Sequence, residues 1–135
     1  MSEAKEFSSF TPEGWQTVTP RIVVEGVPQL VEFLRSVFDA TGEYTADRPT
    51  VMKIGSSMMM ISEPMVRKPM PAFIYVYVDD ADEKYRRAVD AGATPLEEPS
   101  NMPYGDRRGM VQDRWGNVWQ IATYNPSRSE SVDEG

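Results

Sequence analysis

The sequence contains no histidine and no cysteine among its 135 residues. Imidazole is the commonest metal ligand and titrates near neutral pH, and the thiolate is the best protein nucleophile. Their absence excludes a histidine-based triad, a zinc site, a cysteine nucleophile and any disulfide. The chemistry that remains belongs to carboxylates, arginine, lysine, tyrosine and hydroxyl groups, or is binding without a reaction.

Positive charge and long apolar runs are also scarce. Fourteen Lys and Arg stand against 21 Asp and Glu, which gives a formal net charge of -7 and a pI of about 4.6. This charge opposes binding to nucleic acid or to anionic lipid and favours a cationic ligand, although acidity also simply keeps a protein soluble. No run reaches the roughly 20 apolar residues of a membrane span, and the polar start does not resemble a secretion signal. We expect a cytoplasmic protein without nucleic-acid or membrane partners.

The first half of the chain shows one strand and one helix clearly. Alternating residues over Thr17–Glu25 predict a half-buried strand. Apolar residues at three- and four-residue steps over Val27–Phe38 predict an amphipathic helix, which we expect Gly42 to end. Three short strands are expected to follow, at residues 43–46, 49–54 and 57–62.

The second half repeats this order. Ala72–Val78 alternates as a strand, and Asp80 with Glu83 forms a capping box for a helix that Gly92 ends. Three strands are again expected, at residues 94–98, 109–113 and 118–124. The two passes superimpose at an offset of about 54 residues, because Val24 then falls on Val78.

The repeat predicts an α+β fold in which two βαβββ modules form a cupped mixed sheet with the helices on its convex face. Neither module can bury its strand faces alone, so we expect the two half-sheets to join into one larger sheet. The expected segments are an N-terminal arm (1–14), a first module (15–64), a linker (65–71), a second module (72–125) and a disordered acidic tail (126–135).

The repeated array and its Asp-x-x-Gly-Asn turn at 113–117 resemble the vicinal oxygen chelate superfamily, which includes glyoxalases, bleomycin-resistance proteins and extradiol dioxygenases. The sharpest stretch is YGDRRGMVQDRWGNVWQIAT, residues 104–123, which is similar to the bacterial glyoxalase/bleomycin-resistance branch. Thr19 and Pro20 at the start of the first strand are typical of the same branch. The meander between Gly42 and Ser62 is shorter than in most relatives.

The resemblance implies where a metal would lie. Enzymes of this superfamily hold a divalent metal with His, Glu or Gln from the first and last strands of each half, and these positions fall on Thr19, near Met59, on Phe73 and on Gln120. Only Gln120 offers a suitable oxygen, so we expect no metal, no cofactor and no glyoxalase activity. Met59 and Phe73 fit equally well as core residues that fill the former cavity.

Strand alternation assigns the concave face, which we expect to carry Thr19, Arg21, Val23, Phe73, Tyr75, Tyr77, Val118, Gln120 and Ala122. Such an aromatic cup suits a small, flat or amphipathic organic molecule. The candidate ligand-binding residues are Thr19, Arg21, Phe73, Tyr75, Tyr77, Tyr104 and Gln120, and none is assigned a catalytic role. Alternatively, the tyrosines only fill the sheet face and Arg21 pairs with a carboxylate.

The loop over Asn101–Arg108 either covers the mouth of the cup or is an ordinary connection. Within it, Asp106 stands beside Arg107 and Arg108, and adjacent opposite charges are typical of a surface ion pair.

These features lead to a first hypothesis of a metal-free binding protein that sequesters a cationic or aromatic organic compound. The resemblance implies a homodimer, because in relatives of the bleomycin-resistance type the sites lie at a dimer interface. A second hypothesis is a lyase, isomerase or dioxygenase-like enzyme with a non-standard site. A third is a degenerate module that serves only as an interaction partner, which a filled cup would favour.

Overall fold

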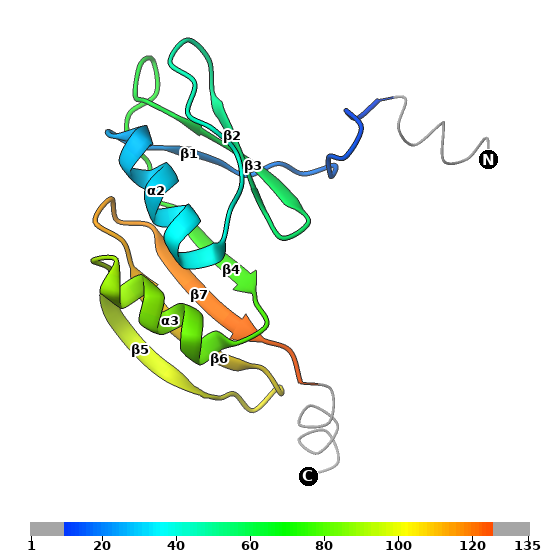
Figure 1. Cartoon of the computed structure of the whole chain (residues 1–135), viewed down its shortest axis with the longest axis vertical. Helices are drawn as coiled ribbons and strands as arrows, with labels where there is room; N and C mark the ends of the chain where they lie inside the picture. Colours follow the sequence, from blue (N-terminus) through cyan, green and yellow to red (C-terminus); the bar gives the residue numbers. More distant parts are fainter. Residues whose placement is uncertain (1–9, 126–135) are drawn as a thin grey trace, which may run out of the picture.

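Two successive units of strands and a helix make up the structure, a computed structural model that describes residues 10–125 (Figure 1). The elements in chain order are β1 (Arg21–Val23), α2 (Val27–Phe38), β2 (Thr50–Ile54), β3 (Ser57–Ser62), β4 (Phe73–Tyr77), α3 (Ala81–Asp90), β5 (Thr94–Asn101), β6 (Arg107–Gln112) and β7 (Val118–Thr123). The predicted tail and most of the predicted arm lie outside the described residues.

Each unit forms its own mixed sheet. The strand order is β1-β3-β2 in the first sheet and β4-β7-β6-β5 in the second. β1 runs parallel to β3 and β4 runs parallel to β7, whereas the other pairs are antiparallel. Helices α2 and α3 pack against each other, and Figure 1 shows both on the same side of the molecule. The predicted α+β fold with two related modules is confirmed.

The expected continuous sheet is divided in two, and the linker bonds to the edge of β1. In a parallel pair, alternate residues direct their backbone groups to opposite edges, so Val23 faces away from β3. The Val23 carbonyl accepts a hydrogen bond from the Met70 N–H at 3.2 Å. The linker therefore pairs with the edge of β1 through one isolated bridge.

The first module also lacks the strand predicted at residues 43–46. Its chain is instead held as a loop by two hydroxyl groups, because Thr50 Oγ1 accepts from the Thr45 N–H at 3.0 Å and Thr45 Oγ1 donates to the Arg48 carbonyl at 3.1 Å. The outer edge of β2 keeps only one isolated bridge, between Thr41 and Lys53. Local side-chain hydrogen bonds thus replace the predicted pairing.

Helix α2 has the predicted bounds and supplies most of the core of the first module. Its N-terminal N–H groups are capped from the residue after β3, since the Glu63 carboxylate accepts from Gly26 and Val27 at 3.1 and 2.9 Å. The helix ends at Phe38, where Asp39 takes the left-handed conformation with φ of 56°, rather than at Gly42. Its buried residues are Val27, Leu30, Val31, Phe33, Leu34, Val37 and Phe38.

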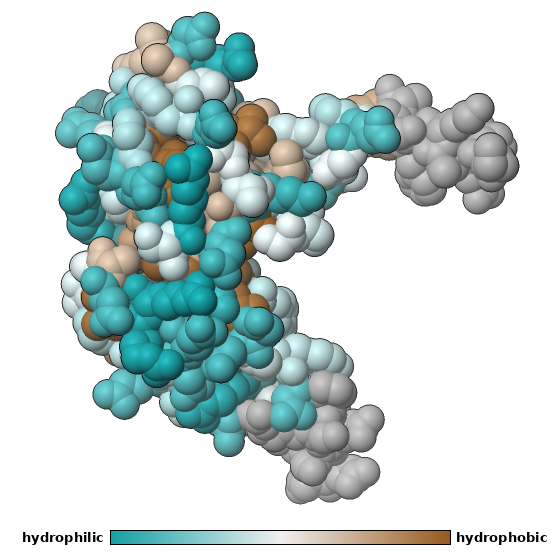
Figure 2. All heavy atoms as spheres, in the orientation of Figure 1, coloured by the Kyte–Doolittle hydropathy of each residue, from teal (hydrophilic) through white to brown (hydrophobic). Residues whose placement is uncertain are grey.

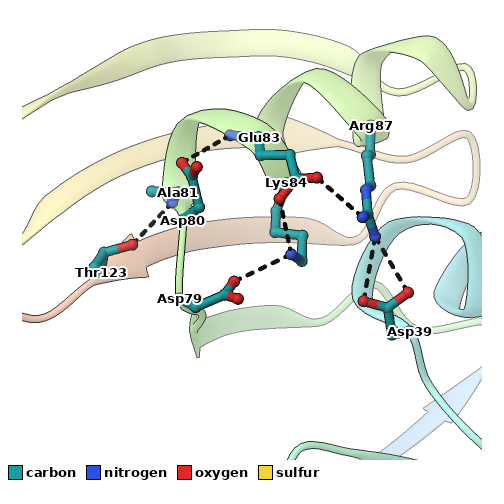
Figure 3. A network of polar contacts seen from close by, with 8 residues as sticks. All are labelled: Asp39, Asp79, Asp80, Ala81, Glu83, Lys84, Arg87 and Thr123. Atoms are coloured by element: carbon teal, nitrogen blue, oxygen red, sulfur yellow. Dashed lines mark hydrogen bonds and ion pairs between the residues drawn. The ribbon is translucent and has the colours of Figure 1, made fainter.

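The N-terminus of helix α3 is capped as predicted, but the capping box is incomplete. The Asp80 carboxylate accepts from the Glu83 N–H at 3.1 Å, and Thr123 Oγ1 accepts from the Ala81 N–H at 2.8 Å (Figure 3). The Glu83 carboxylate does not return to the cap but forms ion pairs within the helix. The cap therefore ties the start of α3 to the end of β7.

An ion-pair network joins the two helices (Figure 3). Lys84 is buried on α3, and its ammonium group contacts Asp79 at 3.1 Å and Glu83 at 3.3 Å. Arg87 contacts Glu83 at 3.0 Å and Asp39, at the end of α2, at 3.2 Å. The contact between Arg87 and Asp39 links the first module to the second.

The outer surface over α3 is strongly polar. Figure 2 shows hydrophilic residues over α3, whereas apolar residues appear as scattered patches nearer the middle of the molecule. Within residues 10–125 no helix is long and apolar enough to cross a membrane.

Candidate functional site

The predicted alternation of the strands is confirmed. Ile22, Val76, Trp119 and Ile121 are buried in the core. On the opposite face of the second sheet, Tyr75 lies beside Gln120, which in turn lies beside Met110. We call this surface, the side of the second sheet away from the helices, the open face. It carries Phe73, Tyr75, Tyr77, Arg108, Met110 and Gln120.

Four residues on the open face form one hydrogen-bonded group, which we call the tyrosine cluster: Tyr75, Tyr77, Tyr104 and Asp106. Asp106 Oδ2 accepts from the Tyr75 hydroxyl at 2.7 Å and from the Tyr77 hydroxyl at 2.9 Å. The Tyr75 and Tyr104 hydroxyls lie 3.1 Å apart. Asp106 is only 3% exposed, but the tyrosines are 36%, 61% and 50% exposed in chain order. The cluster thus has a buried charge beneath accessible aromatic rings.

A tight turn places Tyr104 and Asp106 on this face. The Met102 N–H donates to the Asp106 carbonyl at 2.8 Å, and the Gly105 N–H donates to the Met102 carbonyl at 3.0 Å. Gly105 has φ of 114°, which a residue with a side chain rarely adopts. The loop predicted between Asn101 and Arg108 is therefore folded back over the sheet and completes the cluster.

Burial and the Asp106 carboxylate together keep the phenols protonated. Burial, followed by hydrogen bonds to Tyr104 and Asp106, raises the pKa of Tyr75 far above its ordinary value. The hydrogen bond to Asp106, followed by burial, also raises the pKa of Tyr77. Neither phenol can act as a base at neutral pH, because the negative charge of Asp106 opposes a phenolate beside it. Both hydroxyls donate to the buried carboxylate, while the tyrosine residues themselves stay partly exposed.

The predicted surface ion pair at Asp106 is wrong. Arg107 lies on the helix side of β6, where its guanidinium contacts the Asp82 carboxylate at 2.6 and 2.9 Å. Arg108 shares the open face with Asp106 but pairs with Glu97. Adjacent residues of a strand point to opposite faces, so neighbours in sequence cannot pair in this way. Extending the predicted strand at 109–113 back to Asp106 would have placed it on the same face as the tyrosines.

The other predicted residues of the second half lie on the open face but outside the cluster. Phe73 is 70% exposed, so its ring does not fill the cup. Gln120 lies beside Tyr75 in the register of β4 and β7. Within residues 10–125 the Gln120 amide makes no hydrogen bond, which leaves it available to a ligand.

The predicted residues of the first half are not joined to the cluster. Thr19 precedes β1, and Arg21 on β1 donates to Ser62 Oγ at 3.0 Å rather than to a carboxylate. Arg21 lines a cavity of about 500 Å³ beside the loop at 44–50, whereas Tyr75 and Tyr77 line a groove of about 370 Å³. That groove separates β4 from the hairpin of β2 and β3 and is also lined by Pro20, Ile54, Met58 and Met59.

The positions at which relatives hold a metal do not fit one in this chain. Met59 is buried on the helix side of β3, so Met60 occupies the corresponding position on the other face. Thr19, Met60, Phe73 and Gln120 together offer a hydroxyl, a thioether and an amide, which is a poor ligand set for a hard divalent cation. Residues 10–125 contain no group of three or more His, Cys, Asp or Glu side chains able to hold a metal.

The Asp-x-x-Gly-Asn turn that carries the sequence resemblance has a structural role. Asp113 is buried, and its carboxylate accepts from the N–H groups of Trp115 and Asn117 at 3.0 and 2.9 Å and from the Asn117 amide and the Trp119 indole, both at 2.9 Å. Asn117 Oδ1 in turn accepts from the Ala72 N–H at 2.8 Å. This turn fixes the starts of β4 and β7, from which Tyr75 and Gln120 project.

Comparison with known proteins agrees with this architecture. The family model described as Glyoxalase/Bleomycin resistance protein/Dioxygenase superfamily matches residues 16–121. An uncharacterized protein of Mycobacterium tuberculosis is 27% identical in an alignment that covers 87% of this chain and 78% of that protein.

Two solved structures illustrate the shared fold. TioX from Micromonospora sp. ML1 superimposes with a TM-score of 0.67 at 19% identity, over 82% of this chain and 99% of that one. The fosfomycin resistance protein FosX from Listeria monocytogenes, solved with Mn(II) and a sulfate ion, gives a TM-score of 0.68 at 14% identity, over 86% of this chain and 95% of its own. At these identities the likeness concerns the fold alone.

Proposed function

The chain belongs to the glyoxalase/bleomycin resistance protein/dioxygenase superfamily, and on this premise we propose that it is a metal-independent protein that sequesters a small organic molecule on its open face. The observation that carries the proposal is the tyrosine cluster, in which Asp106 accepts from both Tyr75 and Tyr77. Accessible rings above an ordered polar base provide contact area and orientation for a ligand.

The chemistry of the cluster favours binding over catalysis. Burial and the hydrogen bonds to Asp106 raise the pKa values of Tyr75 and Tyr77. A general base needs a pKa near the working pH, which these phenols lack. The donor set at the superfamily's metal positions supplies no alternative route, because it does not suit a hard divalent cation.

We also propose that the protein works as a homodimer. The Val118 N–H bonds to the Ala72 carbonyl and the Val78 N–H to the Ala122 carbonyl, so the even residues of β4 face β7. The backbone groups of Phe73, Tyr75 and Tyr77 therefore point to the free edge of β4, beside the open face. An edge strand with exposed aromatic residues is a ready surface for a second copy.

Sedimentation of the full chain tests the dimer. Phe73→Glu should shift the protein from dimer to monomer, because two charged side chains would meet at the shared edge, and Phe10→Glu is the control. A wild-type chain that sediments as a monomer at high micromolar concentration would contradict the dimer.

A thermal-shift experiment tests ligand binding. The full chain, treated with chelator and dialysed, is mixed with a panel of small aromatic and amphipathic compounds, both charged and neutral. A compound at 100 times its Kd adds about 2.7 kcal/mol of stability and should raise the Tm by roughly 10 °C. We expect at least one such compound, with a smaller shift in Asp106→Asn and an unchanged shift in the matched variant Asp82→Asn.

Two results would contradict the proposal. One is a panel in which no compound raises the Tm of the chelator-treated protein. The other is elemental analysis that finds a stoichiometric transition metal in protein purified without chelator.

A further inference from the structure

We infer that the tyrosine cluster recognises a methylated ammonium cation, a ligand class that rests on the proposed function of the open face. The inference begins with the charge of Asp106, which is buried and has no cationic partner within residues 10–125. The two nearest arginines in sequence are occupied, Arg107 by Asp82 and Arg108 by Glu97. A buried charge without a partner is costly, so a bound cation would be favoured there.

The arrangement of the rings selects the kind of cation. The Tyr75 and Tyr77 rings lie 5.3 Å apart at an interplanar angle of 57°, with Tyr104 joined through its hydroxyl. Inclined ring faces above a negative charge form the wall of a cation–π site, which a compact cation occupies without needing hydrogen-bond donors. Asp106 itself is almost inaccessible, and its Oδ2 already accepts two hydroxyls. A fully methylated, quaternary ammonium, which has no N–H to place on a carboxylate, fits these surfaces better than a primary ammonium does.

The neighbouring groove indicates what the cation is attached to. Tyr75 and Tyr77 also line the groove of about 370 Å³ beside β4, together with Pro20, Ile54 and Met58. These side chains are mostly apolar, so an aliphatic or aromatic body can lie there while its ammonium head rests on the cluster. The net charge of -7 attracts such a cation over longer distances.

The test compares choline with 3,3-dimethylbutan-1-ol, its neutral isostere in which carbon replaces nitrogen. Binding to the full chain is followed by NMR of labelled tyrosine rings. Choline should bind at least about tenfold more tightly than the alcohol, because only the cation gains cation–π and charge attraction. Asp106→Asn should weaken choline by at least about fivefold, while Asp82→Asn, which changes the same charge on the helix side, should leave its affinity within about twofold.

A second variant covers the case in which Asp106→Asn fails to fold. Tyr77→Leu keeps the carboxylate and its bond to Tyr75 but removes one ring face. It should also lower the affinity for choline several-fold. Equal affinities for choline and the alcohol, with both shifting the cluster tyrosines, would overturn the cation inference and leave the proposed function intact. Absence of binding by both probes would overturn the inference as well, and the separate compound panel then decides the proposed function.

Discussion

The two halves of the molecule share one topology but divide its tasks. At the offset of 54 residues, Leu30 of α2 falls on Lys84 of α3 and Leu34 falls on Ala88, and all four are buried. Helix α2 buries seven apolar residues, whereas α3 buries only Ala81, Lys84 and Ala88. The first half therefore depends on apolar packing, and the second half depends more on hydrogen bonds and ion pairs.

The sheet faces away from the helices differ in the same way. In the first half, β1 and β3 place Arg21 beside Met60, and the outer strand is missing. In the second half, four strands and the loop at 102–105 bring Tyr104 and Asp106 within hydrogen-bond distance of Tyr75. Within the described residues the tyrosine cluster therefore belongs to the second half, which is where we propose that the ligand binds.

The largest effect should come from the polar turn of the second half. Asp113→Ala removes the acceptor of four N–H donors around Trp115, Asn117 and Trp119, so we expect it to lower the free energy of unfolding by about 4 kcal/mol. The turn between β2 and β3 in the first half is the control. Ser56 is exposed there, so Ser56→Ala should change the free energy of unfolding by less than about 0.5 kcal/mol. Denaturant unfolding measures both, and equal losses would contradict the comparison.

Core packing in the first half should give the next largest effect. Leu34→Ala gives α2 the residue that α3 carries at the same place, and the cavity should cost about 3 kcal/mol. Val89→Ala on α3, at a partly buried position, should cost about 1 kcal/mol. If the two variants unfold at the same denaturant concentration, the first half is not the better packed one.

Alkaline pH should affect the second half through its phenols. The folded pKa values of Tyr75 and Tyr77 are raised above the ordinary value of 10.0. The folded state therefore keeps the two phenol protons to a higher pH than the unfolded state does. The resulting contribution to the free energy of unfolding is fully present below pH 10 and is lost as the pH rises through the raised pKa values. Tyr75→Phe should flatten the loss of stability above pH 10, with Tyr44→Phe as the control from the first half. An unchanged alkaline profile in Tyr75→Phe would count against the buried charge beneath the ring.

Acid pH should produce the smallest effect, through Asp82. The hydrogen bond from Arg107 is the main cause that lowers the pKa of Asp82 below its ordinary value of 3.8. The contribution of ionised Asp82 to the free energy of unfolding is present above pH 3.8 and is lost as the pH falls through the lowered pKa. Because the pair is partly exposed, Asp82→Asn should cost less than about 1 kcal/mol at pH 7 and converge with the wild type near pH 2. Glu32→Gln in α2 is the control, and a cost that persists at pH 2 would point to another cause.

Much of the fold could be predicted because it follows from periodic patterns. The spacing of apolar residues predicted the range Val27–Phe38 of α2. Strand alternation placed Trp119 and Tyr75 on opposite faces of the second sheet. The strand expected at 43–46 failed because Thr45 and Thr50 satisfy the local backbone with their hydroxyls, which no hydrophobic pattern reveals. Periodicity also hid the burial of Lys84, which depends on carboxylates that reach it from Asp79 and Glu83.

The candidate site was predicted only in part. Tyr75, Tyr77 and Tyr104 were identified from strand alternation and the adjacent loop, but Asp106 was interpreted as a surface charge. Its burial depends on the turn at Gly105, whose direction is set by three-dimensional packing rather than by residue type. Arg21 was expected in the same cup, yet it lines a different cavity in the first half.

The central claim is that the ligand binds at the tyrosine cluster of the second half, and ring NMR of four of the six tyrosines tests it most directly. Tyr75, Tyr77 and Tyr104 belong to the cluster, whereas Tyr44 lies in the first half and is also exposed. A compound that raises the Tm should shift the rings of the three cluster tyrosines and leave the Tyr44 ring unchanged. Shifts centred on Tyr44, with the cluster rings unmoved, would contradict the account.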